Sequence, residues 1–289
     1  MEKRIFKFGE SSAAVILPKK WMEKNGLKAS DVIYLSEDQA GGLVMAAKES
    51  PRQDVEKVID RRTSSNFINR LIGINYMYGT YKLRIYSQEG FTRSQLDSIE
   101  QRISYDCPGF EITNQSDKDV IIEDLTNIKE VNMDKIMLRL RSLINEEFKE
   151  MTKGDPKTIP KVERLVNRFF MLGIRYINVT QARDAMKFSS VLQDMETISD
   201  RMYILSSKQG VRKFDVFEDL SKQFELSLKG FAGDLDAVEK VSDIRASLIS
   251  KLDKSDIDKL SAYMIKDIAN NISNISEFGL RTEGSNPLG

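Results

Sequence analysis

The sequence predicts a multidomain α+β protein with a small β-rich domain, a small α+β domain and an all-α domain. Short alternating strands separated by glycine turns fill residues 1–49, and strands and helices alternate over residues 52–126. Helical periodicity then continues over 127–281 without a strand pattern. Residues 282–289 are polar and contain Gly and Pro, so we expect a disordered tail there.

The chain is expected to begin with two short strands and a helix. Residues 4–8 alternate between charged and apolar side chains, and residues 15–17 form an apolar strand after a turn at Gly9. Pro18 cannot continue a central strand but fits the first turn of a helix, so we expect a helix from about Pro18 to Asn25. Gly26 then provides the left-handed conformation that closes this helix.

Two more strands complete the N-terminal domain. They are expected over 31–35 and 43–46, joined through the hairpin signal Gly41-Gly42. So few residues leave too small a core for an independently stable domain. We therefore expect a homodimer in which two copies of the chain share strands.

The N-terminal segment is basic although the whole chain is neutral. The chain has 44 Lys plus Arg and 44 Asp plus Glu, whereas residues 1–30 contain seven basic and three acidic residues. Lys19 and Lys20 begin the expected helix, where positive charge opposes the helix dipole. Local positive charge is typical of a phosphate-contacting module within a neutral protein. The alternative is an ordinary solvated lysine surface.

Part of this segment resembles the SpoVT/AbrB family of swapped-hairpin DNA-binding domains. The residues that carry the resemblance are Lys7, Gly9, Ser11, Ser12, Leu17-Pro18-Lys19-Lys20-Trp21 and Gly26-Leu27. Ala29-Ser30-Asp31 replaces the Lys-Gly-Asp that the family usually has before the third strand.

The resemblance implies an intertwined dimeric β-barrel that binds duplex DNA through basic residues of its first strand and helix region. The candidate DNA-binding residues are Arg4, Lys7, Ser11, Lys19, Lys20 and Lys24. The alternative is a small barrel that serves only for dimerisation.

The absence of histidine excludes several kinds of active site. Without histidine there is no Ser-His-Asp or Cys-His catalytic group, no imidazole general base and no His-containing metal site. The two glycine-rich phosphate-binding motifs are also missing from the sequence. We therefore expect neither an enzyme nor a cofactor.

The location of the protein is expected to be cytoplasmic, without membrane insertion. The single cysteine, Cys107, cannot form an intramolecular disulfide, so nothing points to an oxidising compartment. No segment approaches the ~20 apolar residues of a membrane-spanning helix. The charged, alternating N-terminus does not resemble a signal peptide.

The middle domain is expected to follow a polar linker over 48–52. An imperfect helical stripe predicts a helix over 54–72, and alternation predicts a strand over 82–86. Thr92 and Gln95 have the spacing of a capping box, which opens the next helix.

The middle domain is expected to end in a hairpin. Cys107-Pro108-Gly109 terminates the preceding helix, and strands over 110–113 and 120–122 flank a turn over 116–119. The order helix, strand, helix, strand, strand predicts a small α+β unit.

The middle domain offers two kinds of candidate residue. Tyr76, Tyr78 and Tyr81 allow base stacking, but we favour packing around Gly79 because aromatic side chains usually belong to a core. Cys107 is expected to be a small structural residue, since no base is in sight to activate its thiol.

Six helices are predicted after Asn127. The first three carry the apolar residues Met133, Ile136, Met137, Leu140, Leu143, Ile144, Phe148 and Met151, then Val162, Leu165, Val166, Phe169, Leu172 and Tyr176, then Met186, Leu192, Met195, Ile198, Met202 and Leu205. The last three carry Phe214, Phe217, Leu220, Phe224, Leu228 and Phe231, then Val238, Val241, Ile244, Leu248 and Leu252, then Leu260, Met264, Ile268, Ile272 and Ile275. Gln209 is the approximate end of the third helix, and Ser255 is the predicted cap of the sixth. Short loops predict two packed three-helix bundles.

The helical part resembles the PhoU family of phosphate-uptake regulators. The resemblance rests on the tandem three-helix repeat and on Glu196-Thr-Ile-Ser-Asp200-Arg201 in its third helix. Together with the N-terminal domain, this combination resembles an archaeal type of PhoU-like regulator.

Family members carry Glu/Asp-x-x-x-Asp motifs, and some bind multinuclear metal clusters there. The matching pairs in this chain are Glu163 with Asn167, Glu196 with Asp200, Glu239 with Asp243, and Lys266 with Asn270. Three anionic ligands are thereby lost, so we predict no metal site. The alternative interpretations of the remaining acidic residues are a solvated helix face and a surface for a protein partner.

The function expected from these features is transcriptional regulation of phosphate uptake or a related transport response, with sensing in the helical domain. Duplex DNA, a second copy of the chain, and a transporter or signalling protein are the expected partners. One rival is a signalling adaptor that dimerises without binding DNA and docks onto a transporter or kinase. The other rival is a metal-binding helical bundle.

Overall fold

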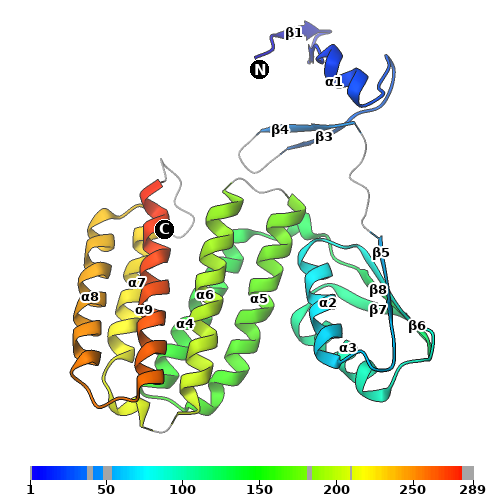
Figure 1. Ribbon diagram of the computed structural model, residues 1–289. Helices are drawn as coiled ribbons and strands as arrows, with labels where there is room; N and C mark the ends of the chain where they lie inside the picture. Colours follow the sequence, from blue (N-terminus) through cyan, green and yellow to red (C-terminus); the bar gives the residue numbers. More distant parts are fainter. Residues whose placement is uncertain (1, 38–41, 48–53, 181–183, 209, 282–289) are drawn as a thin grey trace. The chain divides into compact units, whose positions relative to one another are not determined.

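The computed structural model describes residues 2–37, 42–47, 54–180, 184–208 and 210–281. The chain divides into two compact units, unit 1 (residues 1–51) and unit 2 (residues 52–289). Mixed α+β structure with a helical C-terminal region is confirmed (Figure 1). Within the described ranges, no helix is both long and apolar enough to cross a membrane.

Four predictions concern residues outside the described part of the chain. Three of them are the linker over 48–52, the glycine Gly41 of the hairpin signal and the tail over 282–289. The fourth, the predicted helix end at Gln209, is likewise outside it.

Unit 1 begins with an antiparallel hairpin. Strand β1 (Ile5–Phe8) pairs with β2 (Ser12–Val15), and Gly9 in the turn has φ +72°. The prediction that the second strand covers 15–17 is wrong, because β1 starts at Ile5 and the pairing partner of Ile5 is Val15.

A short helix and a second hairpin complete unit 1. Helix α1 (Lys19–Lys24) follows Pro18, and Gly26 closes it with φ +67° as predicted. Strand β3 (Tyr34–Glu37) pairs antiparallel with β4 (Leu43–Ala46), so the third strand begins three residues later than predicted. In the described part of unit 1 the strands form two separate two-stranded sheets.

The first part of unit 2 is a four-stranded sheet in the order β5-β6-β8-β7. Its strands are β5 (Asp54–Ile59), β6 (Lys82–Ser87), β7 (Phe110–Gln115) and β8 (Asp119–Asp124), and its helices are α2 (Ser65–Met77) and α3 (Arg93–Asp106). Strands β5 and β6 are parallel, whereas β8 is antiparallel to both β6 and β7.

The predicted helix over 54–72 is wrong in its first half, which forms β5. Val55, Val58 and Ile59 have helical spacing, but Asp60 and Thr63 form a turn that ends the segment. Ser64 then caps α2 by accepting a hydrogen bond from the Phe67 backbone N–H at 3.2 Å. The order is therefore strand, helix, strand, helix, strand, strand.

Two local predictions in this region are confirmed. Thr92 Oγ1 accepts from the Gln95 backbone N–H at 3.3 Å, and Gln95 Oε1 accepts from the Thr92 backbone N–H at 2.9 Å, which together form a capping box. The turn at Ser116 joins β7 to β8, with the Ser116 N–H donating to the Asp119 carbonyl at 2.8 Å.

Six helices of the described part form the rest of unit 2 (Figure 1). They are α4 (Met133–Thr152), α5 (Ile159–Thr180), α6 (Ala185–Ser206), α7 (Phe217–Phe231), α8 (Leu235–Asp253) and α9 (Lys259–Glu277). Single-turn helices lie at Ile128–Glu130, Pro156–Thr158, Val211–Lys213 and Phe278–Arg281. Helices α4, α5 and α6 contact one another, as do α7, α8 and α9, and the two sets meet through α6 with α9 and α4 with α7.

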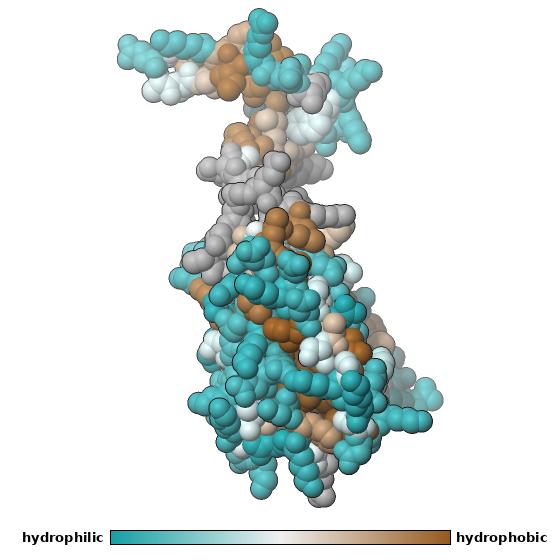
Figure 2. All heavy atoms as spheres, turned by 90° about the vertical axis from the view of Figure 1, so that its left-hand side faces the viewer, coloured by the Kyte–Doolittle hydropathy of each residue, from teal (hydrophilic) through white to brown (hydrophobic). Residues whose placement is uncertain are grey.

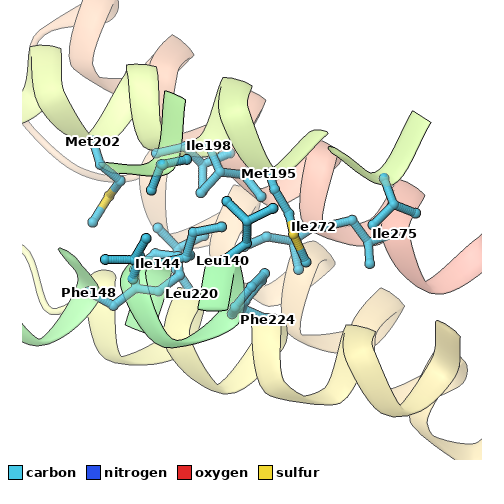
Figure 3. Close-up of a cluster of buried hydrophobic side chains, with 14 of the residues drawn as sticks. Leu140, Ile144, Phe148, Met195, Ile198, Met202, Leu220, Phe224, Ile272 and Ile275 are labelled. Atoms are coloured by element: carbon cyan, nitrogen blue, oxygen red, sulfur yellow. The ribbon is translucent and has the colours of Figure 1, made fainter. Parts of the chain in front are cut away.

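The two sets of helices share one hydrophobic core. Figure 3 shows side chains from α4, α6, α7 and α9 converging between the helices. The labelled residues are Leu140, Ile144, Phe148, Met195, Ile198, Met202, Leu220, Phe224, Ile272 and Ile275. On the side of α8, hydrophilic residues cover most of the surface (Figure 2).

Three helical predictions are wrong in detail. Met186 and Leu260 are 79% and 49% exposed, because each lies in the first turn of its helix, beyond the end of the apolar stripe. The cap of α9 is Asp258 rather than Ser255, since Asp258 Oδ1 accepts from the Ser261 N–H at 3.0 Å.

Helix α5 joins the sheet region to the helical core. Its Val162 and Val166 belong to the helical core, whereas Met171 belongs to the core beneath the sheet. Arg175, only 2% exposed, pairs with Asp124 at 2.5 Å and donates to the Thr80 carbonyl at 3.2 Å. A buried ion pair thus ties α5 to the end of β8.

Candidate nucleic-acid interface

The six predicted DNA-binding residues lie on two elements of unit 1 and on the segments next to them. Arg4 precedes β1, Lys7 lies within β1 opposite Ala13, and Ser11 lies in the turn before β2. The other three residues, Lys19, Lys20 and Lys24, belong to α1. All six are exposed in the single chain.

Helix α1 begins with uncompensated positive charge. Its first turn contains no acidic residue, and Pro18 provides no side-chain cap for the backbone N–H groups. Lys19 lies 3.7 Å from Glu23, but both side chains are largely exposed, so this pair contributes little. The arrangement costs α1 some stability and presents ammonium groups that an approaching anion would stabilise.

The described residues of unit 1 have apolar surface but form no core of their own. Among its described side chains none is buried, and Ile5 and Phe8 are 75% and 70% exposed. The other exposed large apolar residues of unit 1 are Phe6, Val15, Ile16, Val32, Tyr34, Leu35, Leu43 and Val44. Exposed apolar side chains in such number are typical of an interaction surface.

The acidic residues of the first helical repeat do come together. Glu163 on α5 and Glu196 and Asp200 on α6 are half-buried, and burial with mutual repulsion raises the pKa of Glu163 and brings that of Glu196 to about 7. Burial also raises the pKa of Asp200. Asn167, which matches Asp in the motif, is half-buried.

The matching residues of the second repeat do not form such a group. Glu239 and Asp243 are exposed on α8. Lys266 pairs with Asp253 at 2.5 Å, and Asn270 Oδ1 accepts from Arg245 Nε at 2.7 Å. Across the described residues, no group of three or more Cys, Asp or Glu is arranged to hold a metal ion.

A fourth carboxyl group, which the sequence analysis missed, lies next to this cluster. Glu147 on α4 is fully buried, and its Oε1 accepts from Ser199 Oγ at 2.6 Å. Its Oε2 has no hydrogen-bond partner among the described residues. Burial, together with nearby Glu163 and Asp200, raises the pKa of Glu147 to about 8. Its position three residues after Ile144, within the apolar stripe, was the sequence signal that could have found it.

Among the candidate residues of the middle region, Tyr76 and Cys107 have structural roles, whereas Tyr78 faces solvent. Tyr76 is buried, as predicted, and its hydroxyl donates to the Pro108 carbonyl at 2.9 Å. Tyr78 is 67% exposed, so the packing prediction is wrong for it, because it lies just past the end of α2 on the solvent side. Cys107 is buried, and burial raises the pKa of its thiol to about 12.

Comparison with known proteins identifies a family only for the N-terminal region. Residues 7–53 match the family described as antidote-toxin recognition MazE, bacterial antitoxin. None of the curated proteins matches the chain, and none of the solved structures does. The matched region contains the last two residues of β1, all of α1 and five of the six candidate residues, and it supports the predicted AbrB-type domain.

Proposed function

We propose that the protein is a homodimeric regulator that binds duplex DNA through unit 1. The family match over residues 7–53 carries this proposal. Lys7, Lys19 and Lys20 lie within the match and are exposed, as phosphate contacts require.

The dimer follows from the physics of unit 1. The ten large apolar residues that are exposed in the described part of unit 1 include members of its strands β1, β2, β3 and β4. Each such side chain gains about 1.5–3 kcal/mol when it is fully buried. A second copy of the same domain brings an equal set of apolar faces, so strands from two chains can form the core that one chain lacks.

The role of unit 2 is proposed from resemblance. Its tandem three-helix organisation and the Glu196-Asp200 pair resemble PhoU regulators, so we propose that it senses a state of phosphate uptake or related transport in the cytoplasm. In this account the protein regulates and does not catalyse. We propose that unit 2 detects this state by binding a transporter or signalling protein.

A second candidate function is suggested by the matched family itself. The description of this family names antidote-toxin recognition. In such a role, unit 1 or the chain near it would bind a toxin protein. Co-purification of a toxin with the full chain, together with absence of DNA binding, would favour this antitoxin-like role.

The test of the proposal is DNA binding by fluorescence anisotropy over a series of salt concentrations. A mixed-sequence duplex suffices, because phosphate contacts are independent of sequence. We expect the double variant Lys19→Glu, Lys20→Glu to bind more weakly and to reduce the salt slope by about 3–4, since a dimer would lose four phosphate contacts.

The matched control for this test is Lys254→Glu, Lys259→Glu in unit 2, where both lysines are exposed. It makes the same charge change and should leave both affinity and salt slope unaltered. Failure of the folded, dimeric protein to bind any duplex at low salt would contradict the proposal.

A further inference from the structure

The first helical repeat (α4, α5 and α6) and the second (α7, α8 and α9) carry a buried polar residue at the same place. Their first helices match at one constant shift in residue number. The matching buried residues are Ile144, Glu147 and Phe148 on α4 and Leu220, Gln223 and Phe224 on α7. The ring centroids of Phe148 and Phe224 lie 5.9 Å apart where the two repeats meet (Figure 3). A carboxyl group in one repeat therefore takes the place of an amide in the other.

Both side chains contact the third helix of their own repeat at matching positions. Glu147 Oε1 accepts from Ser199 Oγ of α6 at 2.6 Å. Gln223 Nε2 donates to the Ala269 carbonyl of α9 at 3.0 Å and to Ser273 Oγ at 3.2 Å. Ser199 and Ala269 correspond to each other, since each is buried and directly follows a buried isoleucine of its helix.

The two side chains are equally buried and equally short of partners. Both are completely buried, and Glu147 Oε2 and Gln223 Oε1 each have no hydrogen-bond partner among the described residues. A neutral group with one such oxygen costs about 1–3 kcal/mol, whereas an unpaired buried charge costs far more. The amide of Gln223 is always neutral. Glu147 therefore fits the equivalent place only while its carboxyl group holds a proton.

The charged groups that face this buried carboxyl disfavour its ionisation. Glu163 of α5, Asp200 of α6 and Glu146 of α4 itself are acidic, and each of them raises its pKa. On the side of α7, Glu225 is paired with Arg141 at 2.6 Å. An ionised carboxylate at this place would thus meet like charge from its own helix and from both other helices of the first repeat.

We propose that Glu147 is a proton-operated switch of the first helical repeat. With the proton bound, α4 packs on α6 as α7 packs on α9. When the proton passes to solvent, α4 separates locally from α6 and water reaches the carboxylate oxygen that has no partner. Local opening relieves the cost of an unsolvated buried charge. The second repeat stays closed over the same pH range because Gln223 does not titrate.

The direction of the switch follows from the proton balance. Burial raises the pKa of Glu147 from its ordinary value of 4.5 to about 8, and opening restores the ordinary value. The open state therefore releases a proton between these values, so the equilibrium constant for opening rises roughly tenfold for each pH unit. The inference concerns unit 2 alone. It can fail while unit 1 binds DNA, and it can hold if unit 1 does not.

Amide hydrogen exchange of the full chain at pH 6 and pH 8 tests this inference, after correction for the intrinsic exchange rate at each pH. We expect exchange through local opening of α4 and α6 to become on the order of fiftyfold faster at pH 8, because one proton is released over most of this range. Exchange in α7, α8 and α9 should change little. An equal acceleration in both repeats would indicate destabilisation of the whole unit and would overturn the local switch.

Two variants and a control assign the effect to the carboxyl group. Glu147→Gln gives the first repeat the side chain that the second repeat already holds, so it should fold and lose the pH dependence of exchange. Exposed Glu146→Gln is the matched control and should keep that dependence. Adding Gln223→Glu to Glu147→Gln should move the pH dependence to α7 and α9. An unaltered pH dependence in the Glu147→Gln variant overturns the proposal, whether or not the double variant folds.

Discussion

Units 1 and 2 use similar strand patterns with opposite results. In unit 2 the inward residues of β6, such as Leu83 and Ile85, are completely buried beneath helices. In unit 1 every described residue of β1 and β2 is exposed, including Ile5 and Phe8. All residues of the described core belong to unit 2.

The difference shows that alternating apolar and polar residues define which face of a strand is apolar. They do not specify which element covers that face. Unit 2 contains enough chain to cover its sheet with α2 and α3, and α5 packs against both of these helices. The described part of unit 1 has α1 as its one helix, and the six residues of α1 include no buried side chain. A domain of this size has little core of its own, which is why we propose that its function depends on a second chain.

The largest effect is expected from a charge in the apolar surface of unit 1. Phe8→Asp should convert the dimer into a monomer and lower affinity for duplex DNA by ~10²–10⁴-fold, because two linked binding domains are lost together. Sedimentation equilibrium and anisotropy measure the two effects. Ala29→Asp adds the same charge at an exposed turn position and should alter neither.

The next effect concerns the buried ion pair of unit 2. Asp124→Asn should lower the free energy of unfolding by about 3–5 kcal/mol, because it leaves Arg175 buried without its counter-charge. The control is Asp119→Asn in the same strand, whose pair with Arg84 is partly exposed and should cost about 1 kcal/mol or less. Equal losses in urea unfolding for the two variants would contradict this role of Arg175.

A pH-dependent effect of similar total size is expected at Glu147. Its folded-state pKa of about 8 lies above its ordinary value of 4.5, so between these values the native state holds a proton that the unfolded state has released. Stability therefore falls as pH rises through this range, by up to about 1.4 kcal/mol per pH unit. Burial acts in the same direction at Glu196.

The variant Glu147→Gln should flatten this pH dependence. Its free energy of unfolding should therefore change less between pH 5 and pH 8 than that of the unmodified protein. Urea unfolding at both pH values measures the change, with exposed Glu146→Gln as the neighbouring control. An unaltered slope in the Glu147→Gln variant would show that Glu147 is ionised in the folded protein.

The smallest effect is a change of stability in α1. Lys20→Glu should stabilise unit 1 by about 0.3–1 kcal/mol while weakening DNA binding, because an acidic side chain suits the helix N-terminus. Lys24→Glu, in the last turn, should have the opposite effect on stability. Hydrogen exchange of the unit 1 amides measures whether each variant stabilises or destabilises the domain. If amide protection rises in both variants, or falls in both, an effect of the helix dipole is excluded.

Helical periodicity predicted unit 2 best where one face alone is buried. All eight apolar residues predicted for α4 are buried, because that helix packs on one side. Helix α5 was harder, since it serves two cores and buries Met171 and Arg175 outside the predicted stripe. The Thr92 capping box is a local signal and was predicted in full.

The errors have physical causes that sequence spacing cannot detect. Strand β5 gains its ladder from β6, whose partner residue Lys82 lies 28 positions after Asp54. Glu147 is tolerated in the core because a proton and Ser199 compensate it. In the candidate interface, all six predicted residues are exposed, as DNA contacts require. Their contacts with DNA stay a prediction.

The most direct test of the central claim is the mass of the unmodified full chain in solution, by sedimentation equilibrium at low micromolar concentration. One chain has a mass of 33.0 kDa. The account predicts a species of twice that mass, which Phe8→Asp reduces to a single chain. A folded monomer of 33.0 kDa would contradict the claim that a second chain completes unit 1.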